Sequence, residues 1–318
     1  CKSIISLDLS HFDFSNKNLE FFFENCAELE YIKFSNNYKL VTNIDNMFKG
    51  CTSLTSLDLS SFDFKKITKM DFLFNMCNHL TSLDLSNIDA SSVTTMDYMF
   101  AGCNSLKTLN LTKFKTSSVI TIGSMFSDCT SLISLDLSDF DASKVVDMNR
   151  LFYNCIKLVS INFKNFDTSR TTNMESIFYA CNSLESIDLS SFNTSLVIDM
   201  SSMFFGCRKL TSIDLSNFDT HNVQVIFSMF YDCVNLKYIN FYNYYNVSIL
   251  SHNDLFYGTD DELILCIKNK SEEYIKYKLT SNQCVINNCS FEFFEHNRKI
   301  IYSKKIILNL SFEILSIQ

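Results

Sequence analysis

The stretch MFAGCNSLKTLNLTKFKTSSVITIGSMFSDCTSLISLDLSDFDAS, residues 99–143, contains nearly the same pattern twice. A Met-Phe pair, a cysteine and an alternating Leu-x-Leu recur in the same order. Cysteines stand at positions 1, 26, 51, 77, 103, 129, 155, 181, 207 and 233, so that two intervals of 25 residues are followed by seven of 26. Self-similarity at a fixed period of about 20–50 residues is the sequence signature of a repeat architecture. The chain is therefore an array of about ten copies of one unit.

Each copy contains a segment in which apolar and polar residues alternate, as in Leu83-Asp84-Leu85. Alternation with a period of two predicts a short strand with one buried face and one polar face. Ten such strands are expected, beginning near Leu7, Ile32, Leu57, Leu83, Leu109, Leu135, Ile161, Ile187, Ile213 and Ile239.

The Met-Phe segment of each copy has helical spacing. Met96, Met99, Phe100 and Cys103 fall at i, i+3, i+4 and i+7, which places them on one side of a helix. The residue before the first Met is a favoured helix N-cap in five successive copies, namely Thr95, Thr121, Asp147, Asn173 and Asp199. We therefore expect a helix of about 8 residues in each copy, stabilised by packing on the next copy.

A single strand-turn-helix unit cannot bury its own apolar side, whereas stacked units can. The predicted fold class is α/β: a solenoid with a parallel concave sheet of about ten strands and short helices on the convex side. Helices need about 8–10 Å between axes and strands about 4.8 Å, so the outer wall should spread. If the outer turns are tighter than α-helical, the curvature will be weaker.

The repeat unit resembles a known family. CNSLKTLNLTKFKTSSVITIGSMF (103–126), SLDLSDFDASKVVDMNRLF (134–152) and SIDLSNFDTHNVQVIFSMF (212–230) are similar to the BspA-like class of leucine-rich repeat. The resemblance spans residues 1–259, with two shorter copies at the start and a last copy in which His252 and Thr259 replace the expected Met and Cys. It implies a leucine-rich-repeat solenoid and a surface or secreted protein that takes part in adhesion and host-protein binding.

Composition limits the classes of partner. The net charge of −8 argues against nucleic acid, which is bound through clustered Lys and Arg. No apolar run reaches the roughly 18 residues of a membrane span, so no transmembrane segment is expected in this fragment. The chain begins at Cys1 without an initiator Met, and a signal peptide would lie outside it.

The cysteine column could suggest disulfides or a metal array. Each of these cysteines lies on the predicted apolar stripe, and neighbouring helices about 8–10 Å apart exceed the Cα separation that a disulfide tolerates. A zinc site needs four converging ligands, and no C-x-x-C pair or His cluster supplies them. We predict buried free thiols that pack as small apolar groups, no metal site and no cofactor.

The polar positions of the strands form the candidate concave binding face: Asp58, Asp84, Asn110, Asp136, Asn162, Asp188, Asp214 and Asn240. Carboxylates stacked about 4.8 Å apart repel one another, and a basic partner or a cation would relieve this repulsion. The alternative is a solvated face that only keeps the sheet soluble. A specific calcium site is disfavoured, because one carboxylate per strand does not surround a point with oxygens.

No residue pattern predicts catalysis. The Asp after each ring position (Asp13, Asp63, Asp89, Asp141, Asp167 and Asp219) is expected to close a turn through backbone N–H groups. Five His residues (His11, His79, His221, His252 and His296) share no spacing that would converge ligands. Six Asn-x-Ser/Thr matches, at Asn110, Asn193, Asn246, Asn269, Asn288 and Asn309, are candidate glycan acceptors in a secreted eukaryotic protein.

The solenoid is predicted to cover residues 1–259, and residues 260–318 a C-terminal capping or degenerate segment. In that segment, DELILCIKNK (261–270) could add a last strand and SEEYIKYKL (271–279) reads as a short helix. If the protein is exported, Cys266, Cys284 and Cys289 are the expected disulfide formers.

Three classes of function remain. The leading prediction is a non-enzymatic recognition or adhesion protein, cell-surface or secreted, that binds a protein or glycoprotein of a host or matrix through the solenoid face. The alternative is an intracellular leucine-rich-repeat scaffold or effector in the cytoplasm, where disulfides are rare and free thiols are usual. A β-helix enzyme also uses long repeats, but it would show several strands per coil and no stripe at i, i+3, i+4 and i+7.

Overall fold

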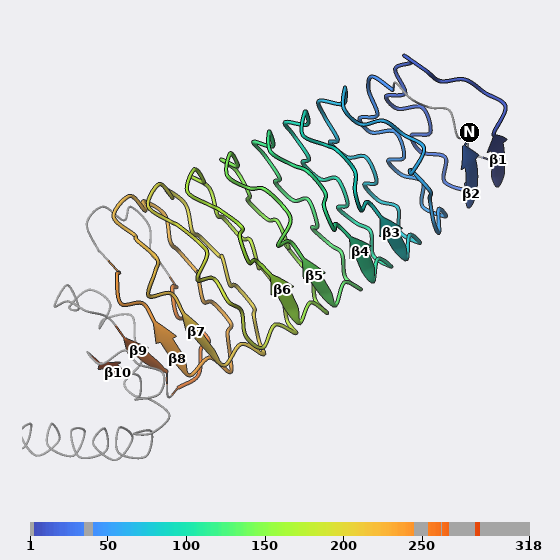
Figure 1. Cartoon of the computed structure of the whole chain (residues 1–318). Helices are drawn as coiled ribbons and strands as arrows, with labels where there is room; N and C mark the ends of the chain where they lie inside the picture. The colour runs from blue at the N-terminus through green and yellow to red at the C-terminus, as the bar shows by residue number, and fades with distance from the viewer. Residues whose placement is uncertain (1–2, 35–40, 245–253, 262, 267–283, 287–318) are drawn as a thin grey trace, which may run out of the picture.

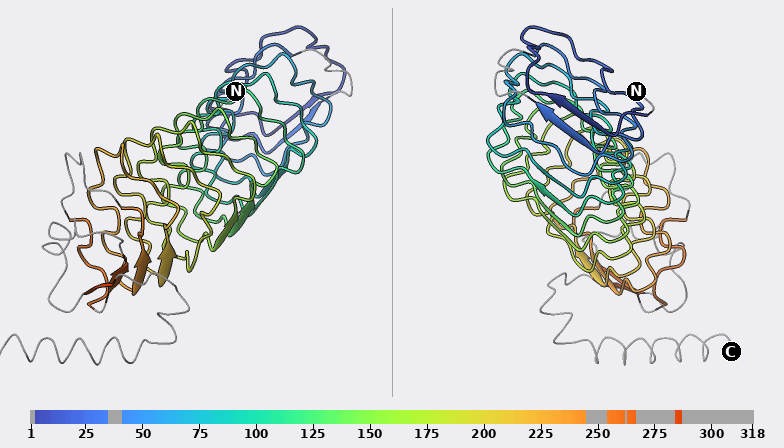
Figure 2. Two further views of the ribbon diagram at one scale, coloured as in Figure 1. Left: turned by 60° about the vertical axis from the view of Figure 1, so that its left-hand side comes forward. Right: turned by 90° about the vertical axis from the view of Figure 1, so that its right-hand side faces the viewer.

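The computed structural model describes residues 3–34, 41–244, 254–261 and 263–266, and the backbone of 284–286. The chain winds into an elongated stack of coils, one coil for each repeat unit of 25–26 residues (Figure 1). Successive coils lie side by side along the whole array, and their strands follow one side of the stack in both views of Figure 2. The chain is therefore a solenoid, as the repeat predicts.

The described residues contain ten short strands: β1 (Ser6–Leu9), β2 (Tyr31–Phe34), β3 (Ser82–Asp84), β4 (Thr108–Asn110), β5 (Ser134–Asp136), β6 (Ser160–Asn162), β7 (Ser212–Asp214), β8 (Tyr238–Asn240), β9 (Ile264–Cys266) and β10 (Cys284–Ile286). All pairs are parallel and join equivalent residues of adjacent coils, such as Leu83 with Leu109 and Ile213 with Ile239. Eight of the expected strands are confirmed, and β9 confirms the strand expected in 261–270. The sheet thus continues past residue 259.

The strands expected near Leu57 and Ile187 are wrong, because these two segments form no strand ladder. The sheet is divided into β1-β2, β3-β4, β5-β6 and β7-β8-β9-β10; two of the breaks fall at Leu57 and Ile187, and the third lies between β4 and β5 of successive coils. Leu57 and Ile187 are only partly buried, whereas Leu83, Leu135 and Ile213 at the equivalent position are buried. The strand side is therefore a row of short ladders with interruptions.

The prediction of helices is wrong, because the described residues contain none. The segment 96–103 and its equivalents, which we call the turn wall, bond instead to the next coil. The N–H groups of Tyr98 and Phe100 donate to the carbonyls of Gly123 and Met125, both at 2.9 Å. The N–H group of Met99, between them, closes a turn on the carbonyl of Met96 at 3.3 Å. Alternate amides thus hold the coil and join it to its neighbour.

Left-handed backbone makes this arrangement possible. Each coil has two residues with positive φ, four apart, such as Tyr98 at 56° and Gly102 at 77°. A right-handed helix cannot pass through such residues, because only single positions adopt the left-handed conformation and each one ends a helical turn. The apolar stripe is buried nonetheless, since Met96, Met99, Phe100 and Cys103 are each at most 1% exposed.

The residues predicted as helix N-caps have a related role. Thr95, Thr121, Asp147, Asn173 and Asp199 form single parallel bridges from coil to coil. The Oδ1 atom of Asp147 accepts the N–H of Asn149 at 2.9 Å, and Asp199 does the same for Ser201 at 2.8 Å. The capping hydrogen bond is therefore present, but it opens a turn and not a helix.

The spacing of the coils follows from the turn wall. Ten phenylalanines, one in each coil, stack face to face with ring centroids 5.3–5.9 Å apart, namely Phe23, Phe48, Phe74, Phe100, Phe126, Phe152, Phe178, Phe204, Phe230 and Phe256. Two strands are about 4.8 Å apart and two helices about 8–10 Å. Because both walls have nearly the spacing of strands, the stack curves little.

Candidate binding face

The strand face consists of the eight outward polar residues of the strand side: Asp58, Asp84, Asn110, Asp136, Asn162, Asp188, Asp214 and Asn240. Seven of them are exposed, as the alternating pattern predicts. Asn240 is the exception, because it is only 6% exposed and its Oδ1 atom has no hydrogen-bond partner in the part of the chain that the structure describes. The placement of Asn240 on an open face is therefore wrong, and the open face ends before β8.

Each exposed Asp of the strand face also closes the strand that carries it. Oδ1 of Asp58 accepts the N–H of Ser60 at 2.8 Å, and Oδ1 of Asp188 accepts the N–H of Ser190 at 2.9 Å. The same bond recurs at Asp84, Asn110, Asp136, Asn162 and Asp214. One oxygen is thus committed to the fold, which leaves Oδ2 turned to solvent.

These hydrogen bonds keep the carboxylates ionised. The Ser60 hydroxyl and N–H lower the pKa of Asp58, and those of Ser190 lower the pKa of Asp188. The expected repulsion between stacked carboxylates is reduced within the chain, because Asn residues interrupt the column. The Nδ2 group of Asn162, for example, donates to Oδ1 of Asp136 at 3.0 Å. No external cation is required by this geometry.

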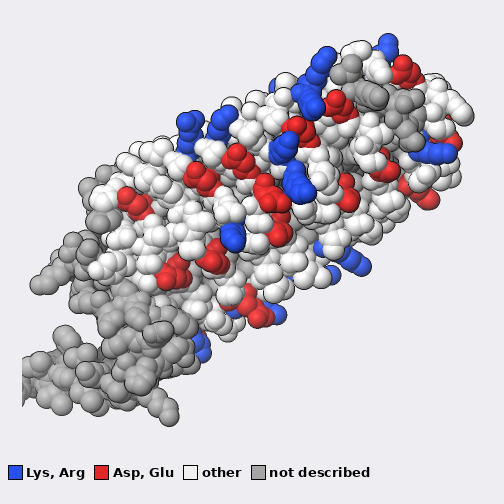
Figure 3. Space-filling view, in the orientation of Figure 1, with Lys and Arg blue, Asp and Glu red and all other residues white. Residues whose placement is uncertain are grey.

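Metal ligands do not converge on this face: no group of three or more His, Cys, Asp or Glu is arranged to hold a metal within the described ranges. Figure 3 shows acidic and basic side chains mixed on the side turned to the viewer, separated by uncharged surface. The charges of the molecule therefore form a pattern of alternating sign on that side and not one acidic field.

The cysteine column is buried and reduced, as predicted. Nine cysteines, from Cys26 to Cys233, are free and buried. Each from Cys51 onward donates its Sγ–H to a phenylalanine carbonyl of the preceding coil, as Cys103 does to Phe74 at 3.2 Å. Burial raises the pKa of these thiols, that of Cys51 to about 12. The coils lie closer together than the 8–10 Å expected for helices, so this expected spacing is wrong; from Cys51 onward each Sγ is turned toward a carbonyl of the preceding coil and not toward another Sγ.

The turn carboxylates and the histidines have the structural roles expected of them. Oδ1 of Asp63 accepts the N–H of Lys65 at 3.0 Å, and Asp13, Asp89, Asp141, Asp167 and Asp219 make the same bond two residues on. His11, His79 and His221 are exposed and far apart in the array, whereas His252 and His296 lie outside the described residues.

Two structural features were not predicted. Five rings, Tyr153, Tyr179, Phe205, Tyr231 and Tyr257, stack along the outside of the turn wall with centroids 4.4–4.9 Å apart. Two cavities also open where the sheet is interrupted, one beside Asp188 and one beside Asp58. Their sequence signal is a Ser-Ser pair after the strand, at Ser60-Ser61 and Ser190-Ser191, preceded one coil earlier by Phe34 or Phe163 in place of the usual Leu.

The C-terminal predictions are tested only in part. Cys266 is disulfide-bonded; the side chains of Cys284 and Cys289 are not among the described residues. Asn110 and Asn193 are exposed, and the other four candidate glycan acceptors fall outside the described residues, as does the helix expected in 271–279. Over the part of the chain that the structure describes, no helix combines the length and apolar character that crossing a bilayer requires.

Comparison with known proteins places the repeat in a family. The model of the family described as "Mycoplasma protein of unknown function, DUF285" matches residues 1–108, 77–160 and 152–262. No curated protein matches the chain by sequence.

Several solved structures are similar at low identity. They include a leucine-rich repeat protein from Bacteroides ovatus (18% identity, 90% of this chain and 84% of that one, TM-score 0.37) and an internalin from Listeria monocytogenes (16%, 90% and 83%, TM-score 0.33). A leucine-rich cell surface protein from Faecalibacterium prausnitzii is 16% identical over 85% of this chain and 76% of that one, with a TM-score of 0.30.

Proposed function

The chain belongs to the DUF285 family, and from the repeat array that the family model covers we propose that it is a non-enzymatic recognition protein of the cell surface or of the exterior. Its partner is a protein or glycoprotein of a host or matrix, bound through the strand face. The observation that carries this proposal is the row of exposed groups in register: a carboxylate or carboxamide from each successive coil, with one oxygen held by the backbone.

A held side chain favours binding, because less rotational freedom is lost when a partner arrives. The Oδ1 bond to the N–H two residues later fixes each side chain and leaves Oδ2 to accept hydrogen bonds from a partner. Serine hydroxyls flank the column on both sides, at positions such as Ser82 and Ser134. The strand face is therefore an extended, pre-ordered set of acceptors.

The chemistry of the cysteines is compatible with the exterior. Nine free thiols would be exposed to oxidation outside a cell, but thiolates are the reactive species and burial disfavours them. Cys155 and Cys181 are completely buried, with pKa values raised by desolvation. The disulfide at Cys266 supports an oxidising compartment, in which such bonds persist. The similarity to BspA-like repeats supports the same assignment.

The binding proposal is tested with a variant that changes charge but not fold. Asp58, Asp84, Asp136, Asp188 and Asp214 are replaced by Asn, which keeps an Oδ1 acceptor for the backbone. The matched control replaces five turn carboxylates by Asn (Asp63, Asp89, Asp141, Asp167 and Asp219). Binding to immobilised mucin and fibronectin is measured by biolayer interferometry, with albumin as the reference surface.

We expect the strand-face variant to lose at least about tenfold in affinity, and the turn variant to bind as the wild type does. Equal binding by both variants, or no binding of the wild type to either glycoprotein, would reject the strand face as the site. Localisation is measured separately, by antibody labelling of intact and of permeabilised cells. Labelling that needs permeabilisation would favour the intracellular scaffold.

A further inference from the structure

Two cavities interrupt the strand face, and an aspartate, two serines and a phenylalanine of the preceding coil line both of them. The Asp188 slot lies between β6 and the segment 186–191, has a volume of about 400 Å³ and is lined by Ile161, Asn162, Phe163, Lys164, Asn165, Asp188, Ser190 and Ser191. The Asp58 slot lies between β2 and the segment 56–61, has a volume of about 430 Å³ and includes Lys33, Phe34, Leu57, Asp58, Ser60 and Ser61. The two slots are 130 residues apart in sequence, which is five coils.

The likeness of the slots extends into the core beneath them. Phe163 packs edge-on against Phe192 of the next coil, with centroids 5.0 Å apart and planes at 78°. Phe34 packs in the same way against Phe62, at 5.0 Å and 87°. In each case a bulky ring lies under the break between two coils. The segment on the other side of each slot has the same sequence, Asp-Leu-Ser-Ser, at residues 58–61 and 188–191.

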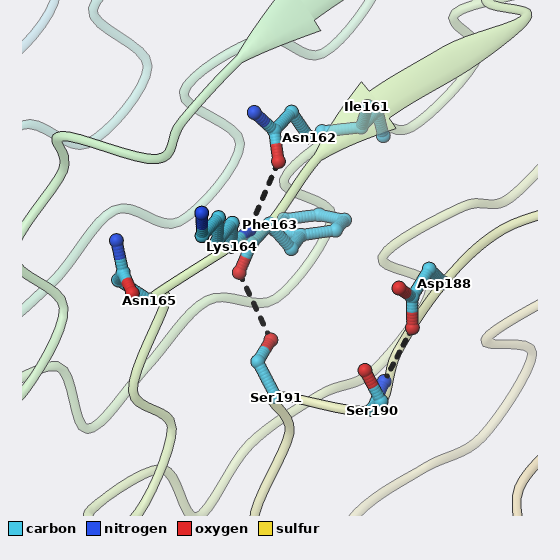
Figure 4. Close-up of a pocket in the computed structure, with 8 residues that line it drawn as sticks. All are labelled: Ile161, Asn162, Phe163, Lys164, Asn165, Asp188, Ser190 and Ser191. Atoms are coloured by element: carbon cyan, nitrogen blue, oxygen red, sulfur yellow. Dashed lines mark hydrogen bonds between the residues drawn. The ribbon is translucent and has the colours of Figure 1, made fainter.

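Polar groups from two coils face the gap of the Asp188 slot, as Figure 4 shows. The backbone N–H of Ser190 holds Oδ1 of Asp188 at 2.9 Å, and the Ser191 hydroxyl donates to the carbonyl of Phe163 at 3.0 Å. The opposite side carries Lys164 and Asn165. Oδ2 of Asp188 and the Lys164 ammonium group make no ion pair within the described residues. Donors and acceptors are thus both available across one cavity.

The balance of these groups identifies the chemistry of the ligand. The lining of each slot holds one lysine and one aspartate, so neither slot offers a net attraction to a polyanion or a polycation; the Lys33 ammonium group also lies 3.7 Å from Oδ2 of Asp8. Serine hydroxyls line both slots, the carboxamides of Asn162 and Asn165 also line the Asp188 slot, and an aliphatic side chain lines each, Ile161 in one and Leu57 in the other. A cavity of about 400 Å³ is within the range of small-ligand sites. A sugar ring, with hydroxyls that donate and accept and an apolar C–H face, fits this set.

We propose that each slot binds one neutral saccharide unit, so that a chain carries two saccharide sites. The inference rests on the proposed function, because it assigns the glycan of a glycoprotein partner to the strand face. Five coils at about 4.8 Å separate the slots by about 24 Å along the stack, too far for one monosaccharide to reach both.

The test uses backbone amide chemical shifts of the full chain by NMR, with glucose, galactose, mannose and N-acetylglucosamine added separately at millimolar concentration. At least one sugar should shift two groups of signals, those around Lys164 and Ser190 and those around Lys33 and Ser60. Asp188→Asn keeps the bond to the Ser190 N–H but replaces the Oδ2 acceptor by a donor. It should weaken the first group of shifts about tenfold and leave the second unchanged.

Asp58→Asn should have the reverse effect, so each slot serves as the control for the other. Asp84→Asn, on the same face but outside both slots, should change neither. The proposal is overturned if no sugar shifts these signals, if glycine or lysine shifts them as strongly as a sugar does, or if Asp188→Asn weakens both groups or neither. These outcomes do not depend on mucin or fibronectin binding, so the two proposals can fail separately.

Discussion

The turn wall and the strand face belong to the same coils, yet they are held in different ways. In the turn-wall segment of each coil between residues 46 and 102, alternate backbone N–H groups donate to carbonyls of the next coil, as those of Phe48, Phe74 and Phe100 do. Along the strand face, four separate ladders leave breaks between them. Hydrogen bonding between successive coils is therefore more continuous along the turn wall than along the strand face. It joins successive coils along the stack, whereas the hydrogen bonding between coils is interrupted on the strand side.

Carboxylates show the same contrast. On the strand face, hydrogen bonds to Ser60 and Ser190 lower the pKa of Asp58 and Asp188. On the turn wall, burial together with the nearby Asp71 and Glu20 raises the pKa of Asp45 to about 6. A carboxylate is thus stabilised where the chain meets solvent and destabilised where the coils are packed.

The largest difference between the walls should appear on truncation of the stacked rings. Phe152 is fully buried, with Phe126 at 5.3 Å on one side and Phe178 at 5.9 Å on the other. Phe152→Ala should lower the free energy of unfolding by about 3–5 kcal/mol, because it removes both ring contacts and leaves a cavity. The control, Phe227→Ala, removes a ring that is 39% exposed and should cost less than about 1 kcal/mol. Urea unfolding followed by circular dichroism measures both, and equal costs would contradict a continuous ring stack.

A smaller effect should follow from changing the left-handed positions. Gly206 has a φ of 70°, and a Cβ atom there would lie at ordinary contact distance, 3.6 Å from the Cα of Ala180. The residue type at position 206 is therefore restricted by the left-handed backbone conformation and not by a lack of space for a side chain. Gly206→Val should cost about 2 kcal/mol, since a β-branched residue is strained there, whereas Gly206→Asn should cost less than about 1 kcal/mol. Urea midpoints compare the two variants. A valine variant as stable as the asparagine variant would exclude the strained turn and favour a helix.

Asp45 should make stability fall as pH rises. Its pKa is about 6 in the folded chain and near 3.8 when unperturbed, so between these values the native state binds more protons than the unfolded state. Stability is then greatest below this window and declines through it. Because Asp45 is partly exposed, solvent screening limits the change in the free energy of unfolding to about 1 kcal/mol. Asp45→Asn should be more stable than the wild type at pH 7 and nearly equal to it at pH 4. A variant less stable than the wild type at pH 7 would contradict this reasoning.

The sequence alone predicts the features that repeat with a clear period. Leu83, Leu135 and Ile213 are buried and Asp84, Asp136 and Asp214 exposed because alternation has only one reading in a half-buried strand. The turn wall could not be told from a helix by its apolar spacing, since Met96, Met99, Phe100 and Cys103 are buried in either structure. A signal against the helix was present: the residue before the cysteine is Gly50, Gly102 or Gly206 in three coils and Asn or Asp in four others, and Gly258 precedes Thr259 in the last. These residues tolerate left-handed backbone.

The candidate site was predictable only in its column of acidic residues. Asn240 was misplaced because its burial depends on what covers β8, which the repeat pattern does not contain. The two slots depend on which neighbouring coils form a ladder. At the slots, Phe34 packs on Phe62 and Phe163 on Phe192, which are contacts between coils, and a pattern within one coil carries no such information.

The smallest effect separates the two roles of the strand-face carboxylates. Asp84→Ala removes the Oδ1 acceptor that holds the Ser86 N–H at 2.8 Å, and it should cost about 0.5 kcal/mol, because water replaces the lost bond at an exposed site. Asp84→Asn keeps an acceptor and should leave the urea midpoint unchanged. If the asparagine variant loses as much stability as the alanine variant, the negative charge itself supports the fold. The contribution of these carboxylates to stability would then explain their recurrence along the strand face, and the proposal that they bind a partner would lose support.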